Sequence, residues 1–388
     1  MAIVDWSELP EHIVARIISY LPLRERSLCC FVCKFWSDAF SHPIVWSHFV
    51  FSIEKSENFS YPNYPEAITK YGHLMKKIKV DIDQGHIENR RIGHQIICAL
   101  SSIPNKKYKS VSFNFTGANP LFYSGLEYIE ALKRFFGNET THSPSSISEV
   151  DLSNLTVPFD DSVINLLAQN HPGLEKLNLV NKVLVNKVSP DSLYNLIYKC
   201  RRMKDLKVFY TSMTEEIMLA LADYNRVPLN HLGLSCRREV KFLPVLSSES
   251  WANLVSMLPD LKVTLFFDHT CPLKKVSRIM KPEIPVQVLQ LETFTMIYSE
   301  LNQACMYYQN TLEMLVLHTR YSEELGKALC NLANCCTKMK EIYVYCVLKK
   351  WVVDEVLANL PKVRESGRYI LRWKESPEPW VVGIEEGD

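Results

Sequence analysis

Cysteines and histidines are the first places to look for chemistry in this chain of 388 residues. Cys30 and Cys33 form a Cys-x-x-Cys pair, a spacing whose thiolates can bind zinc or exchange disulfides. A zinc site of this kind needs a second pair of ligands at a suitable spacing, and none follows. The adjacent Cys335 and Cys336 fit small buried packing better than reactivity. We therefore expect no metal site, no redox centre and no cofactor.

The motifs of the common enzyme classes do not occur in the sequence. The 11 histidines form no His-Glu-x-x-His pair, and there is no Gly-x-Ser-x-Gly elbow, Walker loop or Gly-x-Gly-x-x-Gly turn. Glycine is scarce, with 12 residues, which argues against loops that cradle phosphate. We predict no catalytic residue, and an enzyme with an active site outside these motifs is the least favoured interpretation.

The charge of the chain gives no reason to expect a nucleic acid or a membrane as partner. Basic and acidic residues number 44 and 43, and the basic runs at residues 76–79 and 201–204 are typical of solvated surfaces. There is no run of 18 apolar residues, and the first residues lack the pattern of a secretory signal. We expect a folded protein with reduced cysteines, in the cytoplasm or also in the nucleus.

The larger part of the sequence is a repeat that would position any binding residues. Apolar residues with the spacing apolar-x-x-apolar-x-apolar recur eight times between residues 147 and 344. Their middle positions lie 26 to 29 residues apart, the period of leucine-rich repeats: Val150, Leu177, Leu206, Leu232, Leu261, Leu289, Leu315 and Ile342. Helical segments fill the gaps, several after a capping residue: Asp160, Thr214, Ser299 and Ser322. We expect an α/β solenoid, a horseshoe with parallel strands on its concave side and helices on its convex side.

The ends of the chain differ from this repeat. Residues 5–50 predict three short helices, which are too few for a good core of their own and should bury apolar surface against a partner. Residues 51–146 are irregular leading repeats, with strands expected around Ile78 and Val111 and a polar loop at residues 137–146. Residues 147–361 are the regular leucine-rich repeats, and residues 362–388 are a capping strand and a tail.

Residues 7–46 resemble an F-box. The matching features occur in the expected order: Leu9-Pro10, Ile13, Ile17, Leu21, the Val32-Cys33-Lys34 step, Trp36 and Trp46. With the repeats that follow, the chain resembles the F-box and leucine-rich-repeat proteins. The repeats depart from the family's common pattern, because only residues 171–173 and 258–259 echo the regular Cys-Pro element, and the exact number of repeats stays open.

The resemblance implies a role in ubiquitylation. Proteins of this family are substrate-recognition subunits of SCF ubiquitin ligases, which dock on the Skp adaptor and through it on the cullin and RING subunits. Their repeats hold a protein substrate for ubiquitylation and proteasomal degradation, so such a chain is a substrate adaptor without a catalytic centre. The alternative is a scaffold or interaction protein that acts outside ubiquitylation.

The F-box residues that would bind the adaptor are the apolar residues of its helices. We predict that the Skp adaptor contacts Leu9, Pro10, Ile13, Ile17, Leu21, Leu28, Val32 and Trp36. For Ile17, Leu21 and Trp46, a place inside the F-box core is an equally good interpretation.

The strand residues between the core positions should point out of the concave face. They are mostly charged or polar in the early repeats, whereas in the late repeats they are largely apolar: Val288, Gln290, Met314, Val316, Tyr343 and Tyr345. An exposed apolar patch often marks a binding site, and we predict substrate binding at Met314, Val316, Tyr343 and Tyr345. Two alternatives stay open: the C-terminal tail covers this patch, or the strands are misregistered.

Overall fold

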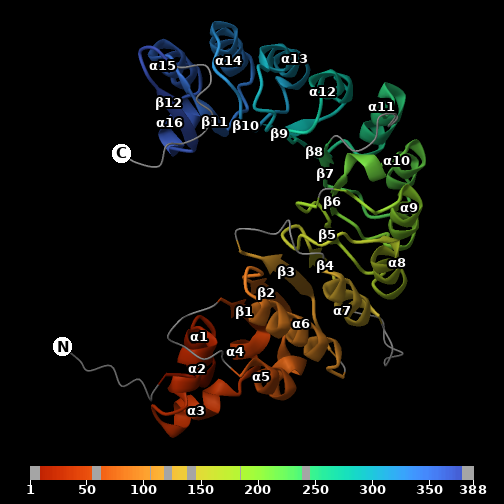
Figure 1. The fold of residues 1–388 in the computed structure, drawn as a ribbon, viewed down its shortest axis with the longest axis vertical. Helices are drawn as coiled ribbons and strands as arrows, with labels where there is room; N and C mark the ends of the chain where they lie inside the picture. The colour runs from red at the N-terminus through yellow and green to blue at the C-terminus, as the bar shows by residue number, and fades with distance from the viewer. Residues whose placement is uncertain are drawn as a thin grey trace, which may run out of the picture. The chain divides into compact units, whose positions relative to one another are not determined.

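The structure of the protein is a computed structural model that describes residues 9–54, 63–104, 106–117, 125–137, 146–183, 185–237 and 245–377. The chain divides into two compact units. Unit 1 comprises Met1–Val188 and Lys199–Arg202, and unit 2 comprises Ser189–Tyr198 and Met203–Asp388. In Figure 1, the helices that connect the strands of each unit lie on one side of those strands. The predicted class, an α/β solenoid that begins with a small helical F-box region, is confirmed.

Unit 1 begins with four helices rather than the three that the sequence predicts: α1 (Glu11–Ser19), α2 (Leu23–Cys29), α3 (Lys34–Phe40) and α4 (Pro43–Ser47). The helix that was not predicted is α4, because proline is generally unfavourable inside a helix. Pro43 instead occupies the first turn, where its missing N–H costs nothing. The ring Nδ1 of His42 caps this turn by accepting a hydrogen bond from the N–H of Ile44 at 3.2 Å.

The strands of unit 1 follow one another in chain order, and each pairs in parallel with the next: β1 (His48–Ile53), β2 (Lys77–Ile82), β3 (Ser110–Phe115), β4 (Glu149–Asp151) and β5 (Lys176–Asn178). One apolar residue per strand forms a register line of Phe49, Ile78, Val111, Val150 and Leu177, as the repeat predicts from Ile78 onward. The connecting elements are α5 (Tyr64–Tyr71), η1 (Gly72–Leu74), α6 (Ile87–Ser101), α7 (Leu126–Phe136) and α8 (Asp161–Asn170). Strand β1 was not predicted. Most of the predicted polar loop, at positions 138–145, lies outside the described residues.

Unit 2 continues the same pattern with longer strands: β6 (Asp205–Phe209), β7 (His231–Cys236), β8 (Lys262–Phe267), β9 (Val286–Leu291), β10 (Met314–Leu317), β11 (Glu341–Leu348) and β12 (Tyr369–Trp373). Its helical elements are α9 (Pro190–Lys199), η3 (Tyr210–Ser212), α10 (Glu215–Leu221), α11 (Ser248–Met257), α12 (Leu273–Ile279), α13 (Tyr298–Tyr308), α14 (Glu323–Cys335), α15 (Lys350–Asn359) and α16 (Pro361–Ser366). From α12 to α16, each helix packs against the next.

One predicted repeat position is wrong. Leu261 was expected to continue the line of middle residues, but Leu232 pairs with Val263 instead. Leu261 lies before β8, in a turn where its N–H bonds to the carbonyl of Leu258. The register shifts between Val263 and Thr264, so that Leu289 pairs with Leu265. From there on Leu289, Leu315 and Ile342 are neighbours, as the repeat predicts.

Alternation along the strands separates a buried face from a partly exposed face. In β11, Ile342, Val344, Cys346 and Leu348 are buried, and the residues between them are partly exposed. We call the partly exposed face of each unit's strands its open face. Three of the four expected helix caps are confirmed: the side chains of Asp160, Thr214 and Ser322 accept hydrogen bonds from N–H groups of the first turn. Ser299 is not a cap, since α13 already begins at Tyr298.

Candidate protein-binding surfaces

The F-box helices enclose a small core that is shared with the first repeat. Val14, Ala15 and Ile18 on α1 are fully buried. Trp46 at the end of α4 is 1% exposed, and its indole N–H donates to the carbonyl of Phe40 at 2.8 Å. Of the interpretations of Trp46 from the sequence, a place inside the F-box core is therefore the one observed. Its ring stacks on Tyr71 of α5, which joins the F-box to the repeat that follows.

A buried arginine holds the turns of the F-box together. The guanidinium of Arg26 donates hydrogen bonds to the carbonyls of Ser19, Leu21 and Val45. It also lies over the ring of Phe49, 5.1 Å from the ring centroid. Burial lowers the pKa of Arg26 to about 10, so the group stays charged at neutral pH. Sequence analysis missed this residue, because an arginine in a charged run is usually exposed.

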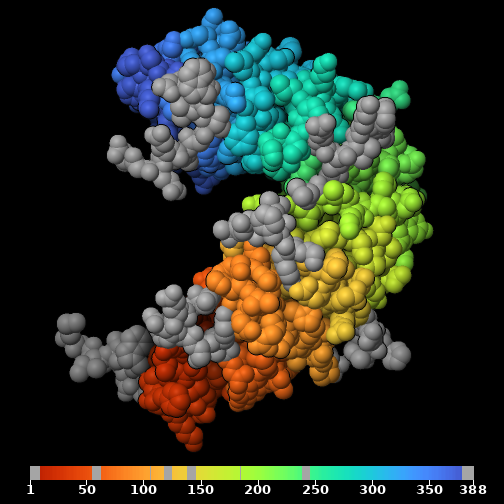
Figure 2. All heavy atoms as spheres, viewed as in Figure 1, coloured from red at the N-terminus to blue at the C-terminus, as the bar shows by residue number. Residues whose placement is uncertain are grey.

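The end of α2 presents large apolar side chains to solvent. Leu28, Phe31 and Val32 are 59%, 84% and 63% exposed. Their spacing places them on one face of the turn, where the N–H of Phe31 bonds to the carbonyl of Leu28 at 3.0 Å. In Figure 2 the F-box residues (red) form a lobe at one end of unit 1. Exposed apolar groups that are clustered in this way are typical of a protein interface.

The residues predicted to bind the adaptor divide into two groups. Pro10, Ile13, Leu28 and Val32 are exposed, whereas Leu9, Ile17, Leu21 and Trp36 are half-buried. The second group lies between the core and the surface, so the alternative of a core role stays open for Ile17 and Leu21. Sequence analysis missed Phe31 and Tyr20, which are both strongly exposed. Phe31 was detectable, since it follows Leu28 by three positions and directly precedes Val32.

The late strands of unit 2 carry the predicted substrate patch on their open face. Strand pairing places Val288 beside Met314, and Val316 between Gln290 and Tyr343. Met314, Tyr343 and Tyr345 are partly exposed, as the alternation predicts. Val316 is 7% exposed and is therefore buried, which corrects its expected exposure. Its small side chain lies between longer neighbours on both sides.

Aromatic rings extend this patch past the ends of the strands. The ring of His318 stacks on Tyr345, with centroids 4.3 Å apart. Phe294 contacts His318 at 5.4 Å between centroids, and its positive φ of 54° is uncommon for a residue other than glycine. Burial lowers the pKa of His318, although the Glu292 carboxylate opposes the shift. No sequence pattern indicates Phe294 or His318, since the geometry of the loops after the strands places them.

A hydrogen-bonded chain on the open face has the residue order of a catalytic triad. Asp205 Oδ1 lies 3.1 Å from Nδ1 of His231, and Nε2 of His231 lies 2.9 Å from Oγ1 of Thr264. The three residues belong to the neighbouring strands β6, β7 and β8. Since the three side chains satisfy one another across the strands, we assign them the role of tying the strands together.

Eight of the 12 cysteines are buried. Burial raises the pKa of Cys271, Cys330 and Cys346 to about 12, which keeps these thiols protonated. Burial also raises the pKa of Cys30, a member of the Cys-x-x-Cys pair. Within the described ranges, no group of three or more His, Cys, Asp or Glu side chains is placed to hold a metal ion. No helix in those ranges is long and apolar enough to cross a membrane.

Comparisons with known proteins agree with this arrangement. Residues 6–52 match the F-box-like family model. F-box/LRR-repeat protein 8 of Homo sapiens is 28% identical over 375 residues, and that of Mus musculus is 29% identical over 374 residues; each match covers 96% of both chains. F-box/LRR-repeat protein 21 of Bos taurus is 26% identical over 278 residues, which cover 69% of this chain and 60% of that relative. Residues 6–52 are therefore similar to an F-box-like domain, and the chain is similar over 96% of its length to F-box/LRR-repeat protein 8.

Proposed function

We propose that this protein is the substrate-recognition subunit of an SCF ubiquitin ligase. The observation that carries the proposal is the exposed apolar face of Leu28, Phe31 and Val32 on an F-box whose interior is already filled. Apolar surface of this kind is stabilised by burial against a partner, at about 25 cal/mol for each Å² removed from water. The partner in this proposal is the Skp adaptor, which connects the chain to the cullin and RING subunits.

In this role the chain is not an enzyme. It raises the local concentration of substrate lysines near the ubiquitin-loaded E2, and the substrate is then degraded by the proteasome. We place this activity in the cytoplasm, with the nucleus as a second compartment.

The substrate site in this proposal is the open face of β9, β10 and β11. Met314, Tyr343 and Tyr345 supply partly exposed apolar and aromatic surface. The stacked rings of His318 and Phe294 enlarge that surface at the ends of the strands. Aromatic side chains with a polar tip are common at the centres of protein interfaces.

Affinity purification with mass spectrometry tests the proposal. The intact chain is purified beside a Leu9→Ala/Pro10→Ala variant, whose changes lie just before α1, at half-buried Leu9 and exposed Pro10. We expect Skp and cullin with the intact chain and a loss of both with the variant, whereas substrates are retained by both. Absence of Skp from both purifications would contradict the proposal and favour a scaffold that acts outside ubiquitylation.

A further inference from the structure

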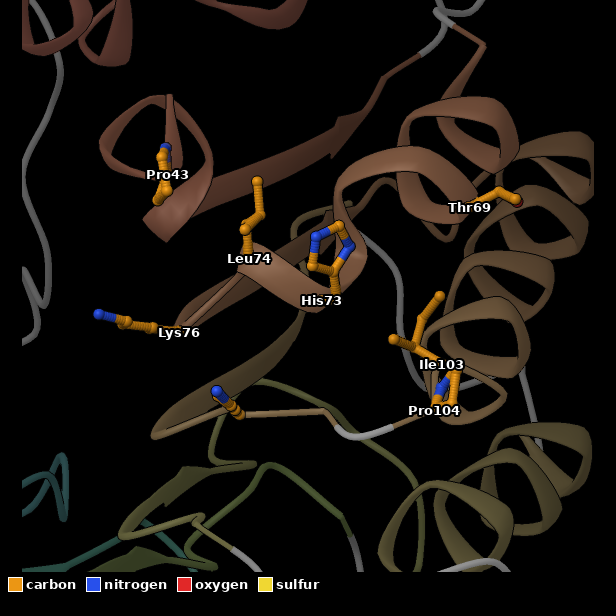
Figure 3. A pocket seen from close by; sticks show the side chains of 8 residues that line it. Pro43, Thr69, His73, Leu74, Lys76, Ile103 and Pro104 are labelled. Carbon is orange, nitrogen blue, oxygen red and sulfur yellow. The ribbon is translucent and has the colours of Figure 1, made fainter. Parts of the chain in front are cut away.

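Unit 1 has a groove of about 510 Å³ (Figure 3). Its lining comes from the start of α4, the end of α5, η1, the residue before β2 and the loop between α6 and β3. Apolar side chains of Pro43, Leu74, Ile103 and Pro104 form part of the wall. The volume is in the range of pockets that bind a small ligand or a few side chains.

Basic side chains line the same groove. Lys76, Lys107 and His73 are exposed lining residues, and the described part of the lining contains no carboxylate. The N–H of Lys109 bonds to the carbonyl of Lys76 at 2.7 Å, which holds the segment before β2 beside the lysine-rich segment before β3. The positively charged residues Lys76 and Lys107, from two different segments, therefore lie in the lining of the same groove.

These charges are not neutralised within the protein. Lys79 pairs with Asp81 at 2.7 Å, and Lys77 attracts the carboxylate of Glu149, whereas Lys76 and Lys107 form no ion pair with any residue that the structure describes. The pKa of the neighbouring His48 is lowered by burial and by the positive charges of Lys77 and Lys76. An anionic partner would relieve this repulsion between like charges.

The chemistry of the lining distinguishes between anionic partners. Its described residues include no arginine, which would favour the bidentate recognition of phosphate, and no Phe, Tyr or Trp on which a nucleic-acid base could stack. The groove instead offers lysines beside aliphatic side chains. A partner that carries separate carboxylates next to an apolar side chain is complementary to such a lining. We propose that this groove binds an acidic peptide segment of a partner protein, with carboxylates at Lys76 and Lys107 and an aliphatic side chain on Leu74 and Ile103.

Fluorescence anisotropy with labelled synthetic peptides tests the proposal on the full chain. The probe is an eight-residue peptide of Asp and Glu with two leucines, and its comparison peptide has Asn and Gln in place of the acids. A Lys76→Glu/Lys107→Glu variant removes the basic groups. The matched control is Lys338→Glu/Lys362→Glu, which changes the net charge equally at two exposed lysines of unit 2. We expect the groove variant to weaken binding of the acidic peptide by about tenfold and the control variant by less than about twofold.

A second variant tests the groove without a change in charge. Thr69 is an exposed lining residue on α5, so Thr69→Trp should fill the groove and leave the fold and the melting temperature unchanged. We expect this variant to lose peptide binding as well.

Four results would overturn the proposal. The first two are that the chain does not bind the acidic peptide, or that it binds the neutral peptide equally well. The other two are that the groove variant and the control variant lose the same affinity, or that Thr69→Trp binds the acidic peptide as the unaltered chain does. A phosphorylated peptide or a single-stranded oligonucleotide that bound more tightly than the acidic peptide would also overturn it. The proposal does not depend on the ligase function, because binding of Skp to the same variants is measured separately.

Discussion

Trp46 of the F-box lies flat on Tyr71 of the first repeat helix, with ring centroids 3.9 Å apart and ring planes inclined by 8°. Trp46 also stacks on Phe49 of β1, at 5.5 Å between centroids. The F-box therefore does not have a core of its own but shares one with the start of the repeat. The position of the adaptor-binding face relative to the first strands of unit 1 is fixed by this packing.

Replacement of Trp46 tests the shared core. Trp46→Ala removes a fully buried ring and should lower the free energy of unfolding by about 3–5 kcal/mol, measured by urea denaturation. Tyr71→Phe keeps the stacked ring and serves as the control, with an expected change below about 1 kcal/mol. A small effect of Trp46→Ala would show that the F-box and the first repeat are not packed as described.

Arg26 should be as important for stability as an apolar core residue. Arg26→Met leaves the carbonyls of Ser19, Leu21 and Val45 without their donor, and we expect a loss of about 3 kcal/mol in unfolding free energy. Arg364→Met, at an exposed position of α16, is the matched control and should have little effect. Equal stability of the two variants would contradict the role of Arg26.

Acid should destabilise the protein through His171. This side chain is buried, its Nε2 lies 3.2 Å from the carbonyl oxygen of Phe136, and desolvation lowers its pKa to about 4. The unfolded chain, with a histidine pKa of about 6.5, takes up the proton first as the pH falls. The stability from the neutral ring is therefore complete above pH 6.5 and is lost as the pH falls toward 4.

The pH dependence can be measured directly. Between pH 7 and pH 5 we expect His171 to account for a loss of roughly 2 kcal/mol in unfolding free energy. A His171→Gln variant should be less stable at pH 7 but lose less on acidification. The account of His171 would be wrong if both proteins had the same slope of stability against pH in this range.

The late strands should bind the substrate. Tyr343→Asp/Tyr345→Asp places two charges on the open face and should abolish recovery of substrates by cross-linking, while Skp binding is unchanged. The control is Tyr194→Asp/Tyr198→Asp, which changes two exposed tyrosines of α9 whose rings stack on each other. If substrates are still recovered and the melting temperature falls, the result would instead favour the alternative that the C-terminal tail covers this patch. The last residues of that tail lie beyond the described range.

The sequence predicts the repeating part of the fold well, because each strand carries its apolar residues at the same spacing. Val150 pairs with Leu177, and Leu289 pairs with Leu315, as the repeat predicts. The error at Leu261 arises because apolar residues occur at both 261 and 263, and the spacing alone does not show which one enters the strand. Strand β1 was missed because its apolar residues continue directly from α4.

The binding surfaces are less predictable from the sequence than the fold. Alternation correctly places Tyr343 and Tyr345 on the open face, but it cannot show that neighbouring strands bury Val316. The positions of Phe294 and His318 depend on the backbone after the strands, including the positive φ of Phe294. The role of Arg26 depends on three carbonyls from separate turns, which no local pattern reveals.

Direct binding to the Skp adaptor tests the central claim most simply. Isothermal titration calorimetry of the purified adaptor with the full chain should show tight binding. The Leu28→Asp/Val32→Asp variant should show no binding. Ile87→Asp/Leu126→Asp adds the same charges at two exposed apolar residues outside the F-box and should bind as the unaltered chain does. No binding by the unaltered chain, or equal binding by all three proteins, would contradict the assignment of this face to the adaptor.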